Sequence, residues 1–463
     1  MAATHRPAML WPEVRRVFAL AIPVALAELG WMTMTFVDTV MVGRLGPAAI
    51  GALGIGNNAY YFFAMFGMGV LLGLDTLVSQ SWGAGNRKDC HNSLMQGIYL
   101  AVAITPPLMI LFALLPPLFY AFGINREVCA LIASFLVTLS YGTLPLLLYG
   151  ALRRYLQGLG HVRPVMFVLI SANVVNWFFN LILIEGRWGI HGLGVAGSAL
   201  STCLARVYMV AMLAFFIWWY ERRSSPGFAA IIRGPDWARL RLLVRIGVPA
   251  ASQVLLEIGA FGAAGILAGR LTPVALAAHE IALNCAALSF MLSLGTASAA
   301  AVAVGHAIGG GDPERARRAG FIALAIGCGF MSCSALAFTL VPDRILHIYT
   351  SDFGVIRIGV SLLGLAALFQ LFDGMQTVLT GALRGLGQTR IPMLTNLWGY
   401  WAIGLPVGYA LCFRFGFGVY GLWCGLTLAL VLIALTLLYC WQRESRGTAV
   451  RNLSHVRESW DLY

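Results

Sequence analysis

Twelve long apolar stretches follow one another along the chain, and this series constrains the fold more than any other feature. A helix needs about 20 predominantly apolar residues to cross the hydrocarbon core of a bilayer. The sequence meets that condition at approximately 17–42, 50–78, 97–122, 129–150, 164–184, 192–219, 244–268, 274–304, 320–341, 355–379, 392–413 and 421–440. With 59% hydrophobic and 11% charged residues, the chain is too apolar for a soluble protein of 463 residues. We predict an all-α polytopic membrane protein with about 12 transmembrane helices.

The second half of the chain repeats the first at an offset of 226 residues. Pro23 corresponds to Pro249, and GRLGP at 43–47 corresponds to GRLTP at 269–273. Further on, QGLGHVR at 157–163 is answered by RGLGQTR at 384–390, at offset 227. Because six spans separate matching elements, both halves have the same orientation, as in transporters built from parallel repeats. We therefore expect an N-terminal six-helix bundle, a basic cytoplasmic linker, a C-terminal six-helix bundle and a cytoplasmic tail, at 1–220, 221–243, 244–442 and 443–463.

The basic residues are distributed loop by loop. A net charge of +12 is compatible with nucleic-acid binding, but the basic residues do not form one patch. If the N-terminus lies inside, 23 of the 31 Lys and Arg residues fall on the cytoplasmic side, as the positive-inside rule requires. We therefore predict a multi-pass protein of the cell (inner) membrane with both termini cytoplasmic, in contact with lipid and not with nucleic acid.

Several predicted spans carry polar residues at helical spacing. Gln253 and Glu257 share one face of the seventh span, and Gln370, Asp373 and Thr377 share a face of the tenth. The other candidates are Asp38 in the first span, Asn176 and Asn180 in the fifth, and Glu280 and Asn284 in the eighth. Acids inside a membrane are costly and mark functional sites by default. We therefore expect these side chains to line a cavity in the bundle interior.

Each of these residues also has a structural interpretation. Glu257 and Asp373 could be parts of buried pairs, and Asp38 lies close enough to the outer end to pair with Arg44. The asparagines could serve as hydrogen bonds between helices. The sequence has no HExxH, GxSxG or GK[ST] motif, and His279 and His306 are not spaced as a metal pair. We therefore expect that the protein is not an enzyme and that it binds no cofactor. We expect no metal site other than one for Na⁺ at Glu257 and Asp373.

Several fragments together resemble the multidrug and toxic compound extrusion (MATE) family, of the bacterial NorM-like kind. They are FVDTVMVGRLGPAAIGALGIG, LDTLVSQSWGAGN, QGLGHVRP, ALAAHEIALNCAALSF, AVGHAIGGGD and FDGMQTVLTGALRGLGQTRIP. The resemblance covers nearly the whole chain and implies two six-helix bundles that export organic cations in exchange for Na⁺ or H⁺. It places cation-coupling acids at Glu257 and Asp373, with the first-span acid of the family, Asp38, as the third cation-coupling residue, and the span-five amides at Asn176 and Asn180. Glu28 and Glu280 depart from the family pattern.

Two functions other than antiport remain to be compared. A flippase for a lipid-linked saccharide could share the paired bundles, but it should carry basic residues in its cavity for a pyrophosphate group, and these spans carry mostly acids. A membrane-embedded enzyme would need a catalytic motif. The sequence therefore favours a secondary active antiporter, which we expect to be a monomer that takes small organic cations and Na⁺ or H⁺ as its ligands.

Overall fold

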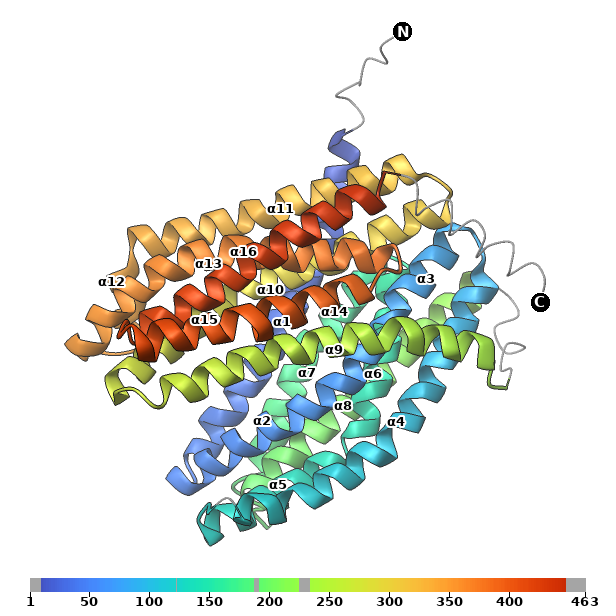
Figure 1. The fold of residues 1–463 in the computed structure, drawn as a ribbon. Coiled ribbons are helices and arrows are strands. Elements are labelled where there is room, and N and C mark those ends of the chain that lie inside the picture. Colours follow the sequence, from blue (N-terminus) through green and yellow to red (C-terminus); the bar gives the residue numbers. More distant parts are fainter. Residues whose placement is uncertain (1–9, 122, 187–190, 225–233, 447–463) are drawn as a thin grey trace. The chain divides into compact units, whose positions relative to one another are not determined.

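The described part of the chain is built from helices. The computed structural model describes residues 10–121, 123–186, 191–224 and 234–446, in which no strand occurs (Figure 1). The helices of the first half are α1 (Leu10–Gly43), α2 (Pro47–Val70), α3 (Gly73–Gly83), α4 (Arg87–Ala121), α5 (Arg126–Ser140), α6 (Thr143–Gly158), α7 (Val162–Leu183) and α8 (Val195–Ser224). Those of the second half are α9 (Trp237–Ala268), α10 (Pro273–Gly309), α11 (Pro313–Leu340), α12 (Pro342–His347), α13 (Phe353–Gly385), α14 (Arg390–Asn396), η3 (Leu397–Gly404), α15 (Leu405–Tyr409), η4 (Ala410–Arg414) and α16 (Val419–Glu444).

Ten of the twelve predicted spans correspond to helices of membrane-crossing length, and the predicted fold class is confirmed. Within the described ranges, ten continuous or nearly continuous helices are long and apolar enough to cross a bilayer. The predicted span 129–150 is a broken one, because α5 and α6 meet at an angle of 46°. The span predicted at 392–413 runs from α14 to η4, where α-helical turns alternate with two π-helical segments. Such π-helical turns widen a helix locally and are rare.

The sequence repeat reappears in the positions at which helices begin and end. Pro47 and Pro273 occupy the first turns of α2 and α10, where the backbone N–H that proline lacks would have no acceptor within the helix. α3 and α10 end at Gly83 and Gly309, again 226 residues apart. The repeat is not complete, because two residues in a turn separate α2 from α3, whereas α10 continues as one helix.

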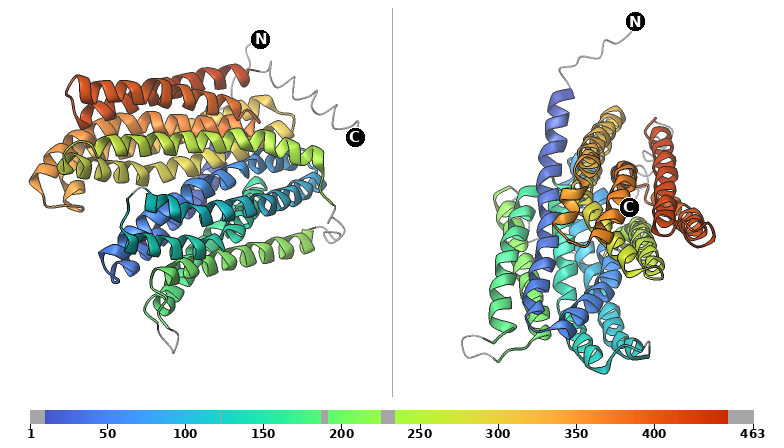
Figure 2. Two further views of the ribbon diagram at one scale, coloured as in Figure 1. Left: turned by 60° about the horizontal axis from the view of Figure 1, so that its bottom comes forward. Right: turned by 90° about the vertical axis from the view of Figure 1, so that its left-hand side faces the viewer.

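The described chain packs into two compact units. The N-unit comprises 26–78 and 86–251, and the C-unit comprises the N-terminal segment up to Ala25, 79–85 and the segment from Ser252 onwards. α1 and α9 each contribute residues to both units, and Figure 2 shows α1 as one long helix. The two divisions fall at equivalent positions, since Ala25 and Ala251 are 226 residues apart.

Each unit has its own helix core. In the C-unit, α10, α11 and α16 all pack against α13 (Figures 1 and 2). In the N-unit, α7 packs against α8, and α5 and α6 each contact both α4 and α8. These cores place α9 and α13 beside each other in the C-unit, and α1, α7 and α8 beside one another in the N-unit, as their side-chain contacts show.

Glycines let the helices approach closely at equivalent places in the two units. A Cβ added to Gly69 of α2 would lie 2.6 Å from the Cα of Ala251 on α9. At the equivalent position of the repeat, a Cβ added to Gly295 of α10 would lie 2.7 Å from the backbone nitrogen of Ala25 on α1. Real Cβ contacts are not so short, so only glycine fits at either place without a shift. Small residues are typical of close helix contacts in membranes.

Candidate functional site

Glu257 on α9 lies at the centre of a polar cluster in the C-unit. Gln253, one turn earlier on α9, donates a hydrogen bond from Nε2 to Glu257 Oε2 at 2.8 Å. Gln376 of α13 donates from Nε2 to Glu257 Oε1 at 3.1 Å. Each carboxylate oxygen therefore accepts one amide donor, and a second helix reaches the acid. The shared face predicted for Gln253 and Glu257 is present in the structure.

Asp373 belongs to the same cluster and is buried, with 5% of its surface exposed. Gln376, which donates to Glu257, lies three residues further along α13 and therefore on the same helix face as Asp373. Tyr400 of η3 is fully buried, and its ring contacts that of Phe261, one turn after Glu257 on α9, with ring centroids 5.7 Å apart. The cluster thus joins α9, α13 and η3 around two carboxyl groups.

Several oxygen atoms of this cluster are buried without a hydrogen-bond partner among the described residues. They are Asp373 Oδ1, Gln376 Oε1, Thr377 Oγ1 and the hydroxyl of Tyr400. Buried polar atoms are nearly always satisfied, so such a group of them calls for a bound species. Carboxylate, amide and hydroxyl oxygens are the ligands of hard cations, and a carboxylate can equally take up a proton. The chemistry of the cluster fits a small cation.

The other predicted residues of the C-unit lie apart from these contacts. Gln370 accepts hydrogen bonds through Oε1 from Ser289 at 2.8 Å and from Ser334 at 3.1 Å, and so connects α13 with α10 and α11. Glu280 and Asn284 are exposed on α10, where Asn284 donates to the backbone oxygen of Glu280 at 2.9 Å. No hydrogen bond in the described part of the chain joins Glu280 to the Glu257 cluster.

Asp38 on α1 forms a second polar cluster, which belongs to the N-unit. Asn180 of α7 donates to Asp38 Oδ1 at 2.6 Å, and Thr202 of α8 donates to Oδ2 at 3.0 Å. Asn176 accepts from Asn180 at 3.2 Å. Arg44, the alternative partner considered for Asp38, instead pairs with Glu185 at 3.2 Å. The structure therefore brings together the three N-unit residues predicted from sequence.

Beside Asp38, the N-unit carries paired charges and stacked aromatic rings. Glu28 pairs with the buried Arg153 of α6. Trp31 stacks on Tyr149, with ring centroids 6.3 Å apart, and meets Tyr61 edge-on at 6.2 Å. An aromatic cluster next to an acid can hold the apolar body of an organic cation.

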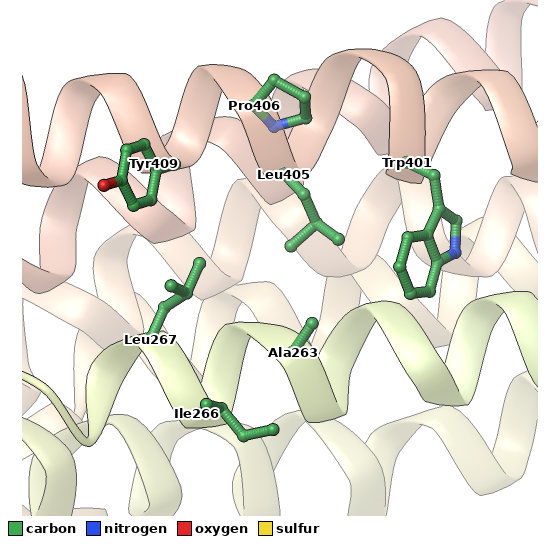
Figure 3. Close-up of a pocket in the computed structure, with 7 residues that line it drawn as sticks. All are labelled: Ala263, Ile266, Leu267, Trp401, Leu405, Pro406 and Tyr409. Atoms are coloured by element: carbon green, nitrogen blue, oxygen red, sulfur yellow. The ribbon is translucent and has the colours of Figure 1, made fainter.

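An apolar groove in the C-unit lies between α9 and the span that contains η3 and α15. Its volume is about 390 Å³ (Figure 3). Ala263, Ile266 and Leu267 line it from α9, and Trp401, Leu405, Pro406 and Tyr409 line it from the other side. Trp401 also donates from Nε1 to the backbone oxygen of Leu256 at 3.0 Å, which fixes η3 beside the residue that precedes Glu257. Because no charged residue lines the groove, it suits an apolar group and not an ion.

Sequence reasoning did not identify Gln376, Tyr400 or Thr202. Gln376 had a usable signal, since it lies three residues after Asp373 on the same helix face. Thr202 and Tyr400 had none, because a single hydroxyl in an apolar span looks like any packing residue until the partner helix is known. In the described ranges, no group of three or more His, Cys, Asp or Glu side chains is arranged to hold a metal ion.

Comparison with known proteins identifies the family. The family model MatE matches residues 23–182 and 249–410, two segments that begin 226 residues apart. The multidrug resistance protein NorM of Burkholderia vietnamiensis is 37% identical over 431 residues, which cover 91% of this chain and 92% of that protein. A probable multidrug resistance protein NorM of Mesorhizobium japonicum is 35% identical over 454 residues, covering 96% of this chain and 97% of that protein.

Solved structures share the fold. The crystal structure of the eukaryotic MATE transporter AtDTX14 aligns with a TM-score of 0.84 at 20% identity, over 96% of this chain and 99% of that one. An outward-facing multidrug resistance MATE family transporter aligns with a TM-score of 0.83 at 18% identity, over 95% and 97% of the two chains. These two structures show the fold alone, and the MatE model and the NorM relatives show the family: the chain belongs to the MATE family of multidrug efflux transporters.

Proposed function

We propose that this transporter is a secondary active antiporter that exports cationic organic compounds in exchange for Na⁺ or H⁺. The NorM relatives are named for multidrug resistance, which supports export of varied compounds. The observation that carries the ion coupling is the Glu257–Asp373 cluster, where two acids and several unpartnered oxygens lie together inside a membrane-spanning unit. Antiport needs such a group, because the ion and the drug must influence the same protein state.

The proposed coupling is electrostatic. Negative groups in a medium of low dielectric attract a cationic substrate, and Phe261, which contacts both Tyr400 and Phe369, offers an aromatic surface beside them. Na⁺ or a proton at Glu257 or Asp373 cancels that attraction. If the ion binds one conformation more tightly, its entry expels the drug and shifts the conformational equilibrium. Linkage then requires drug to weaken ion binding by the same factor.

We further propose the membrane arrangement predicted from the charges. The transporter lies in the inner membrane with both termini cytoplasmic, as a monomer in which 1–220 and 244–442 form the two bundles, 221–243 the linker and 443–463 the tail. Reporter fusions after Gly46 and Arg126 should then be external, and those after Arg87 and Arg446 cytoplasmic. An external signal after Arg446 would contradict this topology.

Reconstitution in liposomes tests the function directly. A Na⁺ gradient and a pH gradient are imposed separately, and accumulation of a fluorescent organic cation is followed. We expect one of the two gradients to drive accumulation by the wild-type protein and not by Glu257→Gln, with Glu314→Gln as the control because Glu314 is exposed. Accumulation that is independent of both gradients would refute antiport, and would leave a flippase for a lipid-linked saccharide as the alternative to examine.

A further inference from the structure

Arg206 on α8 is a charged residue buried in the interior of the N-unit, with 1% of its surface exposed. Its Nη1 donates to the hydroxyl of Tyr60 at 2.8 Å and to the backbone oxygen of Gly142 at 3.3 Å. Its Nη2 donates to the hydroxyl of Tyr61 at 3.3 Å, and its Nε has no partner among the described residues. All these acceptors are neutral. Gly142 lies where α5 and α6 meet, so Arg206 connects α8 with α2 and with that bend.

Two other arginines of the N-unit, both on α6, are paired differently. Arg153 forms an ion pair with Glu28, and Arg154 lies 3.3 Å from Asp75. For Arg206, no carboxylate of the described chain lies within salt-bridge distance. A charge left without compensation inside a membrane-spanning unit is strongly unfavourable. The countercharge of Arg206 should therefore lie somewhat further away.

Asp38 is the complementary case in the same unit. It is 5% exposed, its hydrogen bonds come from neutral groups, and no cation of the described chain pairs with it directly. Thr202, which donates to Asp38, lies four residues before Arg206 on α8 and therefore on the same face, one helical turn away. Thr202 therefore links the two charged residues, since it is hydrogen-bonded to one and lies one turn from the other.

We propose that Arg206 is the countercharge of Asp38 and a specificity-determining residue for cation binding. Together the two residues make the Asp38 cluster electrically neutral, whereas the Glu257–Asp373 cluster holds two acids and no basic residue among its contacts. The positive charge of Arg206 keeps cations from accumulating at Asp38 and leaves the C-unit cluster as the stronger attractor. The binding part of this inference rests on the proposed function, but the charge compensation does not.

A double-mutant cycle in thermal stability tests the compensation without any transport assay. We expect Arg206→Gln to lower Tm of the purified full-length protein by about 5 °C or more, because it leaves Asp38 buried without its countercharge. Arg206→Gln combined with Asp38→Asn should recover at least half of that loss. If the decrease in Tm of the double variant equals the sum of the decreases in the two single variants, the proposal is overturned.

Arg153 provides the matched control for this cycle. Arg153→Gln should be rescued by Glu28→Gln and not by Asp38→Asn, because its partner is Glu28. Rescue of Arg153→Gln by Asp38→Asn would show a general effect of charge removal and would overturn the assignment. If Arg206→Gln does not accumulate at all, recovery of folded protein in the Arg206→Gln, Asp38→Asn variant supports the proposal, and failure to recover it contradicts the proposal. Arg206→Lys, which keeps the charge, should fold.

Binding of tetraphenylphosphonium to the purified protein tests the role in specificity. Two unit charges about 10 Å apart, at an effective dielectric of about 20, change a binding constant roughly tenfold. Arg206→Gln should therefore bind this cation roughly tenfold more tightly than wild type, and Arg206→Lys should bind it as wild type does. Adding Asp38→Asn should abolish the gain. Unchanged affinity in Arg206→Gln would contradict the role in specificity. If the wild-type protein shows no gradient-driven transport, that result contradicts only the proposed function.

Discussion

The two acid clusters of this transporter use the same chemical group in different surroundings. In the N-unit, both oxygens of Asp38 accept hydrogen bonds, and Arg206 lies one helical turn from Thr202, which is one of the two donors. In the C-unit, Glu257 accepts from Gln253 and Gln376, and Asp373 Oδ1 has no partner among the described residues. A saturated, compensated carboxylate has little to gain from an additional cation. A cation at the C-unit pair would give Asp373 a missing ligand and would neutralise charge on both acids, which is why we propose that ion exchange takes place in the C-unit.

The internal repeat does not extend to these acids. The position equivalent to Asp38 is Ala264, and the position equivalent to Glu257 is Trp31, at the offset of 226. The glycines at close helix contacts, in contrast, are present in both halves, as Gly69 and Gly295 show. The repeat therefore accounts for these helix contacts of the scaffold, whereas the acids differ between the two halves.

The largest effect is expected from neutralising the C-unit acids. Glu257→Gln and Asp373→Asn should each abolish ion-driven export while leaving the protein in the membrane, because each removes a negative charge that binds the coupling cation. Export measured in liposomes, with the amount of inserted protein determined in parallel, checks this. Asp343→Asn is the control, since Asp343 is exposed on α12. Full export by either cluster variant would refute the assignment.

A smaller effect is expected from Asp38. Asp38→Asn keeps an oxygen that accepts from Asn180 or Thr202, so export should fall several-fold and not vanish. The same liposome assay measures it. If Asp38→Asn were as inactive as Glu257→Gln, the distinction between the two clusters would not hold.

Stability should respond to the glycines of the scaffold equally in both units. Gly69→Ala and Gly295→Ala should each destabilise the protein by about 1–3 kcal/mol, because the added methyl group overpacks a helix contact. Gly54→Ala in α2 should instead stabilise by up to about 1 kcal/mol, because no atom lies within 4 Å of its added Cβ and alanine favours the helix. Thermal unfolding of the purified variants compares them, and a Gly69→Ala variant as stable as Gly54→Ala would contradict the close packing.

The smallest effect is expected from Tyr400→Phe. The substitution removes a buried hydroxyl that has no hydrogen-bond partner in the described part of the chain, so stability should change by less than about 1 kcal/mol. Affinity for the coupling ion should fall by no more than several-fold if the hydroxyl is one of several ligands. An ion titration of drug binding measures this, and complete loss of ion dependence would make Tyr400 a primary ligand.

Most of the helices could be predicted from sequence, because a membrane-spanning helix is defined by local composition and length. The prolines and glycines at helix ends, such as Pro273 and Gly309, also act locally. The break at Tyr141–Gly142 and the π-helical segments η3 and η4 were not predictable in this way, since they depend on packing against other helices. In the candidate site, Glu257, Asp373 and Asp38 stand out because acids are rare in such spans. The roles of Gln376 and Thr202 can be recognised only once the helix that faces each of them, and the acid on it, are known.

The most direct test of the proposed coupling is the equilibrium affinity of a cationic drug for the purified transporter, measured across a Na⁺ titration and a pH series from about 5 to 8. The account predicts that rising Na⁺ or rising H⁺ weakens drug binding to the wild-type protein, and that Glu257→Gln largely removes this dependence. A wild-type affinity that stays constant across both series would contradict ion coupling at the Glu257–Asp373 cluster.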